Sequence, residues 1–379
     1  MTALLPPALR ARSPMPPRAP RTLPLLALLA LLALLPMLGA CSEAAYYWQA
    51  GLGQWELLSK RRPIAEVLAD PDVSAAVKAR LHLVQDVQRF GTEHLALPAE
   101  GHYTTYADLG RPVVSWLVVA APPLSLEAHE FCYLIVGCLG YRGYFAREDA
   151  AALAAALREE GLDAIVRPVQ AYSTLGWFSD PVLNTFLGGD ETRLAGTILH
   201  EQAHRRYFLK GATDFNESFA EFLEAEGVRR FLSQPGREPA QRARFEAIQA
   251  DEARFRAIVL GGRERLAALY ASPLPDAEKL ARKAELLAAM RQDYQNQRSS
   301  FTLLHYDDWF DRPLNNAHLV GVAQYARHVR AFQALFAESG RDFPRFYAAV
   351  EALGGLPAGQ REARLNELEL TPVARTQRP

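Results

Sequence analysis

Five consecutive residues, His200-Glu201-Gln202-Ala203-His204, place the strongest constraint on how this chain can fold. Residues four apart lie on one face of an α-helix, so His200 and His204 can direct their ring nitrogens at one metal ion if the segment is helical. Glu201 then lies beside the ion, where a general base for hydrolysis is needed. The motif predicts a helix that carries a metal-dependent hydrolytic site. The alternative is a helix surface with two histidines and a solvated glutamate.

The residues around the motif favour a helix that is packed on one side. Asp190 or Thr192 can cap its N-terminus, and Gly211 is the expected stop. Four apolar residues recur at helical spacing through the segment: Leu194, Ile198, Leu199 and Ala203. The two histidines therefore fall in the middle of the predicted helix.

A third metal ligand is expected downstream, because zinc in hydrolytic sites usually takes three protein ligands and leaves one position open. Asp214 begins a second amphipathic segment, in which Glu217 is the predicted third ligand of a single Zn²⁺ ion. Glu221, one helical turn later, is predicted to accept a hydrogen bond from a ligating histidine and to orient it. Two other interpretations stay open. Glu217 can pair with Asp214 in a helix capping box, and Glu221 can be an ordinary solvated charge.

The order H-E-x-x-H followed by N-E-x-x-x-E resembles the glutamate-zincin metallopeptidases, in which the second motif supplies the third ligand and a supporting acid. Other stretches resemble one group, the putative zinc aminopeptidases of bacterial envelope lipoproteins. Besides the metal motif, these stretches are Gly51-Leu52-Gly53-Gln54, Gly137-Cys138, Tyr141-Arg142-Gly143-Tyr144-Phe145, Ala171-Tyr172-Ser173-Thr174-Leu175-Gly176-Trp177-Phe178, Phe215-Asn216-Glu217-Ser218-Phe219-Ala220 and Leu314-Asn315-Asn316-Ala317. The resemblance implies a zincin-like core and a zinc peptidase that acts on a peptide substrate.

The first 40 residues resemble a bacterial export signal. They contain four arginines and no acidic residue, and Leu25–Leu35 is an unbroken run of leucine and alanine that is too short to span a bilayer. Leu38-Gly39-Ala40-Cys41 resembles a lipobox, which implies that Cys41 is lipidated and begins the mature protein. Ser42 is typical of lipoproteins sent to an outer membrane. The alternatives are a cleaved signal peptide or an N-terminal anchor, and translation can also begin at Met15.

The remaining two cysteines and the charge balance bear on compartment and partners. Cys132 and Cys138 can form a small disulfide loop in an oxidising compartment, or can be two buried reduced thiols. The whole chain has a formal net charge of −1, and loss of the four arginines in the signal would make it more acidic. Since basic residues form no patch, nucleic acid is excluded as a partner. We expect a lipid-anchored envelope protein that faces the periplasm. The sequence does not identify a protein partner.

The predicted fold class is α+β and predominantly helical, with a zincin-like core and a C-terminal helical hairpin. Residues 41–233 form the expected α+β catalytic region, and residues 234–379 a mainly helical region packed on it. The strand candidates are Val113–Ala120, Phe131–Val136 and Ala164–Val169. The helix candidates beyond the metal motif are Arg242–Tyr270 and Ala277–Gln297, which form the hairpin, a helix from Asn315 to near Arg330, and Phe332–Leu353.

The function predicted from these features is zinc-dependent hydrolysis of peptide bonds, with Glu201 as the general base. A tyrosine or histidine that stabilises the oxyanion is also expected in such an enzyme. The candidates are Tyr172, Tyr207, Tyr306, Tyr325 and His318. Two alternatives stay open. The protein can be an envelope endopeptidase, or it can be a binding or assembly lipoprotein that keeps zinc only for structure.

Overall fold

The computed structural model describes residues 43–98, 103–133, 137–171, 180–324 and 328–371. The predicted signal peptide, Cys41 and the aromatic stretch Tyr172–Phe178 lie outside these residues. Within the described ranges, no helix is both long and apolar enough to cross a lipid bilayer.

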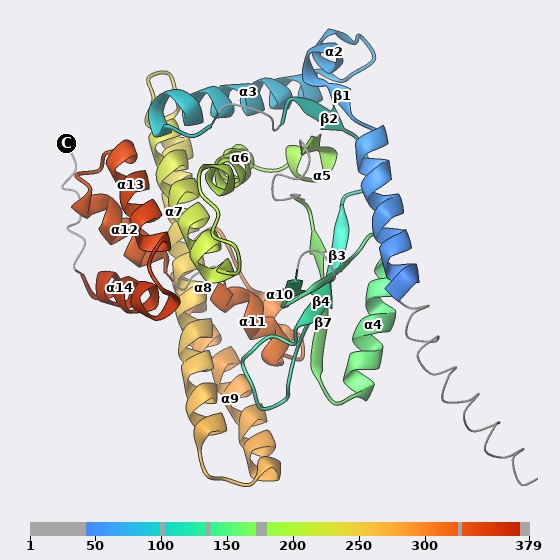
Figure 1. Cartoon of the computed structure of the whole chain (residues 1–379), viewed down its shortest axis with the longest axis vertical. Coiled ribbons are helices and arrows are strands. Elements are labelled where there is room, and N and C mark those ends of the chain that lie inside the picture. Colours follow the sequence, from blue (N-terminus) through green and yellow to red (C-terminus); the bar gives the residue numbers. More distant parts are fainter. Residues whose placement is uncertain (1–42, 99–102, 134–136, 172–179, 325–327, 372–379) are drawn as a thin grey trace, which may run out of the picture. The chain divides into compact units, whose positions relative to one another are not determined.

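The chain forms two compact units, Met1–Leu52 and Gly53–Pro379. Residues 43–52 of the first unit and residues 53–59 of the second are helical. The further elements of the second unit up to the metal motif are β1 Arg62–Pro63, α2 Ile64–Ala69, α3 Ala75–Leu95, β2 Thr105–Ala107, β3 Ser115–Ala121, β4 Phe131–Tyr133, β5 Gly137–Leu139, β6 Arg142–Tyr144, α4 Arg147–Glu159, β7 Asp163–Val169, β8 Val182–Leu183 and α5 Asn184–Leu187 (Figure 1).

Helices dominate the rest of the second unit, so its described part is predominantly helical with small sheets (Figure 1). The metal motif lies on α6 (Glu191–Arg206), and α7 (Thr213–Phe231) follows it. The later elements are α8 Pro239–Ala271, α9 Asp276–Gln297, the 3₁₀ turn Arg298–Ser300, α10 Asp307–Asp311, α11 Asn316–Gln324, α12 Val329–Glu338, α13 Phe343–Gly354 and α14 Ala358–Leu370. The mixed segment before α6 and the helical segment from α6 onward together agree with the predicted α+β class.

The longest paired strands belong to the antiparallel sheet of order β6-β3-β7. Strand β3 pairs with β7 along its whole length, from Ser115 opposite Val169 to Ala121 opposite Asp163. Alternate residues of a strand point to opposite faces. Accordingly, Val118 packs with α4, whereas Ala121 packs with α11 on the other face. A sheet covered on both faces explains why β3 is almost entirely apolar rather than alternating.

The largest core surrounds α6 and joins it to α3, α7, α12, α13 and α14 (Figure 1). Phe219 of α7 lies at its centre, with ring centroids 5.7 Å from Phe332 of α12 and 6.0 Å from Phe346 of α13. Both of the predicted regions, 41–233 and 234–379, therefore contribute to one core.

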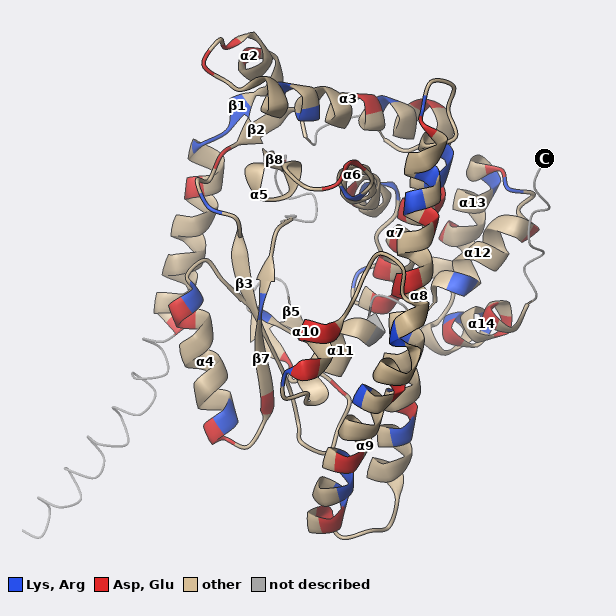
Figure 2. Cartoon of the chain, turned by 180° about the vertical axis from the view of Figure 1, so that it is seen from behind, with Lys and Arg blue, Asp and Glu red and all other residues tan. Residues whose placement is uncertain are grey.

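The second core lies in the hairpin of α8 and α9, which are the two long helices predicted to form it. Basic and acidic residues are both spread along these two helices (Figure 2). Asp251 of α8 is fully buried, and its carboxylate accepts hydrogen bonds from the backbone N–H groups of Thr302, Leu303 and Leu304. Burial alone would raise the pKa of Asp251, but these amides hold it below its ordinary value. The carboxylate thus fixes the chain segment that leaves the hairpin.

Asn316 joins the hairpin to the sheet. Its side-chain oxygen accepts from the Tyr270 hydroxyl at 2.8 Å, and its Nδ2 donates to the carbonyl oxygen of Ser125 at 2.8 Å. Its backbone N–H donates to Asp163 Oδ2 at 2.8 Å, the same oxygen that Lys283 contacts. Because Asn316 is fully buried and makes all of these bonds, its role is structural: it connects the hairpin to the sheet.

The C-terminal helices differ from the prediction in two ways. The single stretch Phe332–Leu353 is wrong, because α12 ends at Glu338 and α13 begins at Phe343. Gly340 adopts a φ of 70° in the break, and Asp342 caps α13 by accepting from the backbone N–H of Arg345. Helix α14, which buries Leu365 and Leu368, was not predicted. In the predicted helix from Asn315 to Arg330, α11 ends at Gln324, and residues 325–327 lie outside the described part.

Candidate active site

The helix that carries the metal motif is held at its start and along one face. Asp190 is its N-cap and accepts from the backbone N–H of Thr192 at 2.8 Å, which settles the choice between the two predicted caps. The predicted apolar face, with Leu194 and Ile198 among its members, is fully buried. The helix ends at Arg206. Gly211, with a φ of 77°, therefore lies in the connecting loop and is not the residue that stops the helix.

Asn216 fixes the loop that returns the chain from α6 to α7. Its side-chain oxygen accepts from the backbone N–H of Leu209, and its Nδ2 donates to the carbonyl oxygen of the same residue, each at 2.8 Å. Asn216 is 2% exposed, so both bonds are shielded from water. This clamp explains how so short a connection brings Glu217, the next residue, back to His204.

Three side chains converge from the two helices. The Nε2 atoms of His200 and His204 lie 3.2 Å apart, and the carboxylate of Glu217 lies 3.4 Å from the first nitrogen and 3.6 Å from the second. These side chains are 15%, 9% and 19% exposed, respectively, so the cluster is mostly buried but reachable. Donors bound to tetrahedral zinc at about 2.0–2.1 Å are separated by about 3.3 Å. The donor set and its spacing therefore fit a zinc ion.

The charges in the cluster are unevenly distributed. Burial alone would lower the pKa of His200, but hydrogen bonds with Glu217 and Glu224 raise it well above its ordinary value. Burial and the neighbouring charge of His200 lower the pKa of His204 to about 4. Burial alone would raise the pKa of Glu217, but the bond from His200 lowers it. His204 is thus held neutral, whereas His200 must release its proton before it can bind a metal ion.

The carboxylate beside the second ring nitrogen of His200 belongs to Glu224 and not to Glu221, which was predicted to lie there. The Nδ1 atom of His200 lies 3.1 Å from Glu224 Oε2, while Glu221 lies 3.6 Å from Arg256 of α8. Burial raises the pKa of Glu221 to about 7. The physical reason is where the helices cross. A Cβ atom added to Gly196 would lie 2.6 Å from Glu224 Oε1, so the missing side chain at Gly196 lets Glu224 lie against α6 and reach His200.

Glu201 is half-buried next to His200. The negative charge of Glu201 acts on Tyr103, which is fully buried. The pKa of Tyr103 is raised well above its ordinary value, mainly by burial and further by the charges of Glu201 and Asp180. Tyr103 has a backbone φ of 54°, an uncommon conformation for an aromatic residue that often marks functional sites. Tyr103 is not among the predicted site residues, because nothing in the sequence links it to α6.

The three oxyanion candidates that the structure describes have their recorded contacts with residues outside the cluster. Tyr207 packs its ring on Phe215 and its hydroxyl against Gly354, and Tyr306 stacks on Phe255 at 4.0 Å. The other described candidate, His318, shares a hydrogen bond with Asn315, and burial lowers its pKa to about 4. The remaining candidates, Tyr172 and Tyr325, lie outside the described residues.

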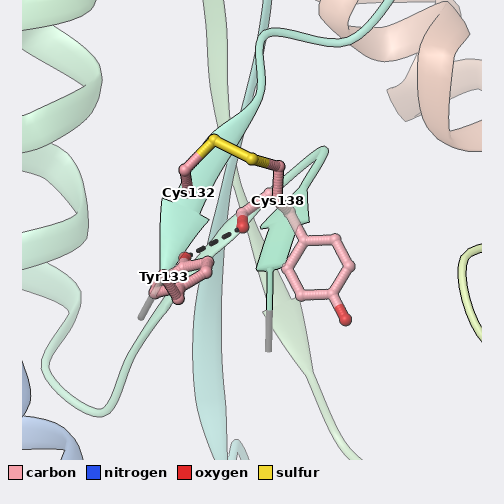
Figure 3. The surroundings of a disulfide bond; sticks show 4 residues. Cys132, Tyr133 and Cys138 are labelled. Atoms are coloured by element: carbon pink, nitrogen blue, oxygen red, sulfur yellow. Dashed lines mark hydrogen bonds between the residues drawn. A yellow bond between two sulfur atoms is a disulfide. The ribbon is translucent and has the colours of Figure 1, made fainter. Parts of the chain in front are cut away.

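Cys132 and Cys138 form a disulfide across the hairpin of β4 and β5, where they are directly paired residues (Figure 3). The hydroxyl of Tyr133 donates to the carbonyl oxygen of Tyr141 beside it, at 3.2 Å. Glu130 lies near the two sulfur atoms, and all three residues are exposed. Since both sulfurs are bonded to each other, the described residues offer one group of three free donors for a metal ion, His200, His204 and Glu217.

Comparison with known proteins adds one match. No curated protein and no solved structure matches the chain. A family model described as "putative aminopeptidase" matches residues 45–365, which include both metal-site helices. Because this match covers most of the sequence, the chain belongs to the family of putative aminopeptidases.

Proposed function

We propose that this protein is a zinc-dependent peptidase of the bacterial cell envelope and, following its family, an aminopeptidase. One observation carries the proposal. Two imidazole nitrogens and a carboxylate, from His200, His204 and Glu217, converge beside Glu201 at separations that suit tetrahedral zinc. Three donors leave one position for water, whereas a structural zinc site usually closes with four protein ligands.

Zinc, when bound, supplies a Lewis acid that polarises a substrate carbonyl and lowers the pKa of water. The carboxylate of Glu201 accepts the proton that water loses on attack, and later delivers it to the nitrogen of the leaving amine. Glu224 holds the ring of His200 through Nδ1, which leaves Nε2 free to face the cluster. Each of these tasks belongs to a side chain whose position is fixed by α6 or α7.

Two substitutions separate catalysis from metal binding. Glu201→Gln should keep zinc and lose about 10²–10⁴-fold in kcat, because the variant has no carboxylate to move the proton. His204→Ala should lose zinc as well, as measured by metal analysis of the purified protein. Full turnover in Glu201→Gln would overturn the assignment of Glu201 as the base.

The exopeptidase half of the proposal needs its own test. An aminopeptidase recognises the free α-amino group of its substrate, so it should cleave free peptides and spare N-acetylated copies, and a chelator should stop the cleavage. Equal cleavage of both peptides would instead identify an endopeptidase. Stoichiometric zinc without hydrolysis of any peptide would favour a binding lipoprotein that keeps zinc for structure.

The envelope location is proposed from the N-terminal sequence. The Leu38-Gly39-Ala40-Cys41 motif supports lipid anchoring at Cys41 after removal of residues 1–40. Ser42 supports transfer to the outer membrane, with the enzyme facing the periplasm. Cys41→Ala should abolish labelling by a fatty-acid probe in bacterial cells, and labelling that persists would contradict the assignment.

A further inference from the structure

Phe208 is exposed beside the candidate metal cluster. Its side chain is 46% exposed, and among the described phenylalanines it is the exposed one. The centroid of its ring lies 6.3 Å from that of His204, with the two planes at 76°, which is an edge-to-face arrangement. An apolar ring therefore borders one of the proposed ligands.

The fold enforces this exposure, because both neighbours of Phe208 are fixed. Tyr207 donates its backbone N–H to Ala203, and its ring packs in the core on Phe215. Leu209 is clamped through both of its backbone groups to the side chain of Asn216. The backbone cannot turn the ring of Phe208 into the core without breaking one of these anchors. The backbone position of Phe208 is thus fixed on the side of His204 where its ring is exposed to solvent.

The surroundings of Phe208 on the ligand side are otherwise polar. The cluster consists of two imidazoles and a carboxylate that are 9–19% exposed, so part of each donor can be reached from solvent. Substrate pockets are lined mainly by apolar and aromatic side chains around a few polar groups, so an apolar ring next to the metal-binding donors suits the wall of a substrate subsite. A substrate side chain that covers the ring would remove apolar surface of both groups from water.

We propose that Phe208 is the apolar wall of the subsite that receives the substrate side chain next to the scissile peptide bond, and that it makes the enzyme prefer a large apolar residue there. The inference rests on the proposed peptidase function and adds its substrate class, peptides with leucine-like or aromatic residues at that position. A small or charged side chain, such as alanine or lysine, gains little from the ring. Contacts of this kind discriminate by about tenfold or somewhat more.

The test compares kcat/KM for peptides with leucine, alanine or lysine before the scissile bond. In Phe208→Ala, the preference for leucine over alanine should fall about tenfold, while cleavage of the alanine peptide and the zinc content stay near the wild-type values. Phe208→Leu should restore most of the preference. The matched control is Leu280→Ala on α9, where a similarly exposed apolar residue, 44% exposed, is removed and the preference should not change.

Two results would overturn the inference. An unchanged leucine preference in an active Phe208→Ala enzyme would show that the ring does not contact the substrate. An equal fall for all peptides together with loss of zinc would show that Phe208 only shields His204.

If the zinc-loaded wild type cleaves no peptide, the peptidase proposal fails separately. The variants are then compared by calorimetry for binding of leucyl and alanyl peptides, and equal dissociation constants for these peptides in the wild type would exclude the subsite.

Discussion

Gly196→Ala tests whether Glu224 orients His200, because this substitution should weaken zinc binding without weakening the fold. In an ordinary helix interior, alanine in place of glycine stabilises by about 1 kcal/mol. Here the new Cβ atom would lie 2.6 Å from Glu224 Oε1 and 3.2 Å from Cδ and Cγ of the same side chain. Glu224 is a flexible side chain, so it moves away, and its 3.1 Å contact with His200 Nδ1 is lost.

The magnitude follows from the role of such a contact. Loss of a carboxylate that orients a ligating histidine typically costs 10–100-fold in metal affinity. A hundredfold loss corresponds to about 2.7 kcal/mol. The metal-free protein should unfold at the same denaturant concentration as the wild type or a higher one, whereas competition with a chromophoric chelator should give a zinc Kd that is 10–100-fold higher. Glu224→Ala should show the same loss of affinity.

Two variants complete the test. The double variant of Gly196→Ala and Glu224→Ala should bind zinc no more weakly than Glu224→Ala alone, because both changes remove one contact. Glu221→Ala is the matched control and should leave the zinc Kd within a few-fold of the wild type. The reasoning is refuted if Gly196→Ala binds zinc as tightly as the wild type, or if the losses in the double variant add.

Three further substitutions probe stability. Gly227→Ala should lower the free energy of unfolding by about 1–2 kcal/mol in urea titrations, because its Cβ would lie 2.8 Å from Leu199 Cδ1. Asp251→Asn should cost about 3 kcal/mol at pH 7. The pKa of Asp251 is lowered on folding, so the wild type loses stability as pH falls. The difference in the free energy of unfolding between the wild type and Asp251→Asn should therefore narrow below about pH 4. For Glu221, whose pKa is raised to about 7, the sign is opposite, and the wild type should lose stability as pH rises. With chelator present, the free energy of unfolding of Glu221→Gln relative to that of the wild type should therefore increase by about 2 kcal/mol between pH 5 and pH 8. A gain that is absent or larger at pH 5 would contradict this.

The sequence predicted those features that depend on local spacing. The i, i+4 pair of histidines, the apolar face of α6 and the long helices of the hairpin all follow from periodicity along one element. Periodicity does not decide whether Glu221 or Glu224 contacts His200. Both residues lie on α7, three positions apart, so either one can face α6. The choice depends on the level at which α7 passes Gly196.

Features that depend on contacts between distant segments were missed for the same reason. Tyr103 approaches the charge of Glu201 across about a hundred positions of sequence, and no periodicity records that approach. The last helix, α14, carries only a few apolar residues, and its two buried leucines pack on helices that lie before it in the chain. A prediction from one sequence has no access to such partners.

The geometry of the candidate site is set less by the HExxH motif than by residues that hold α6 and α7 at one fixed crossing. Asn216 clamps the loop between the helices, which determines the level at which Glu217 meets His204. At the far end, Gly227 of α7 lies against Leu199 with no room for a side chain, so α7 stays close to α6 from Glu217 to Gly227. Ligands from two helices keep separations of 3.2–3.6 Å only if both ends of the crossing are fixed. A chain with the same two histidines but a bulky residue in place of Gly196 or Gly227 would therefore carry the HExxH motif without forming the three-residue site.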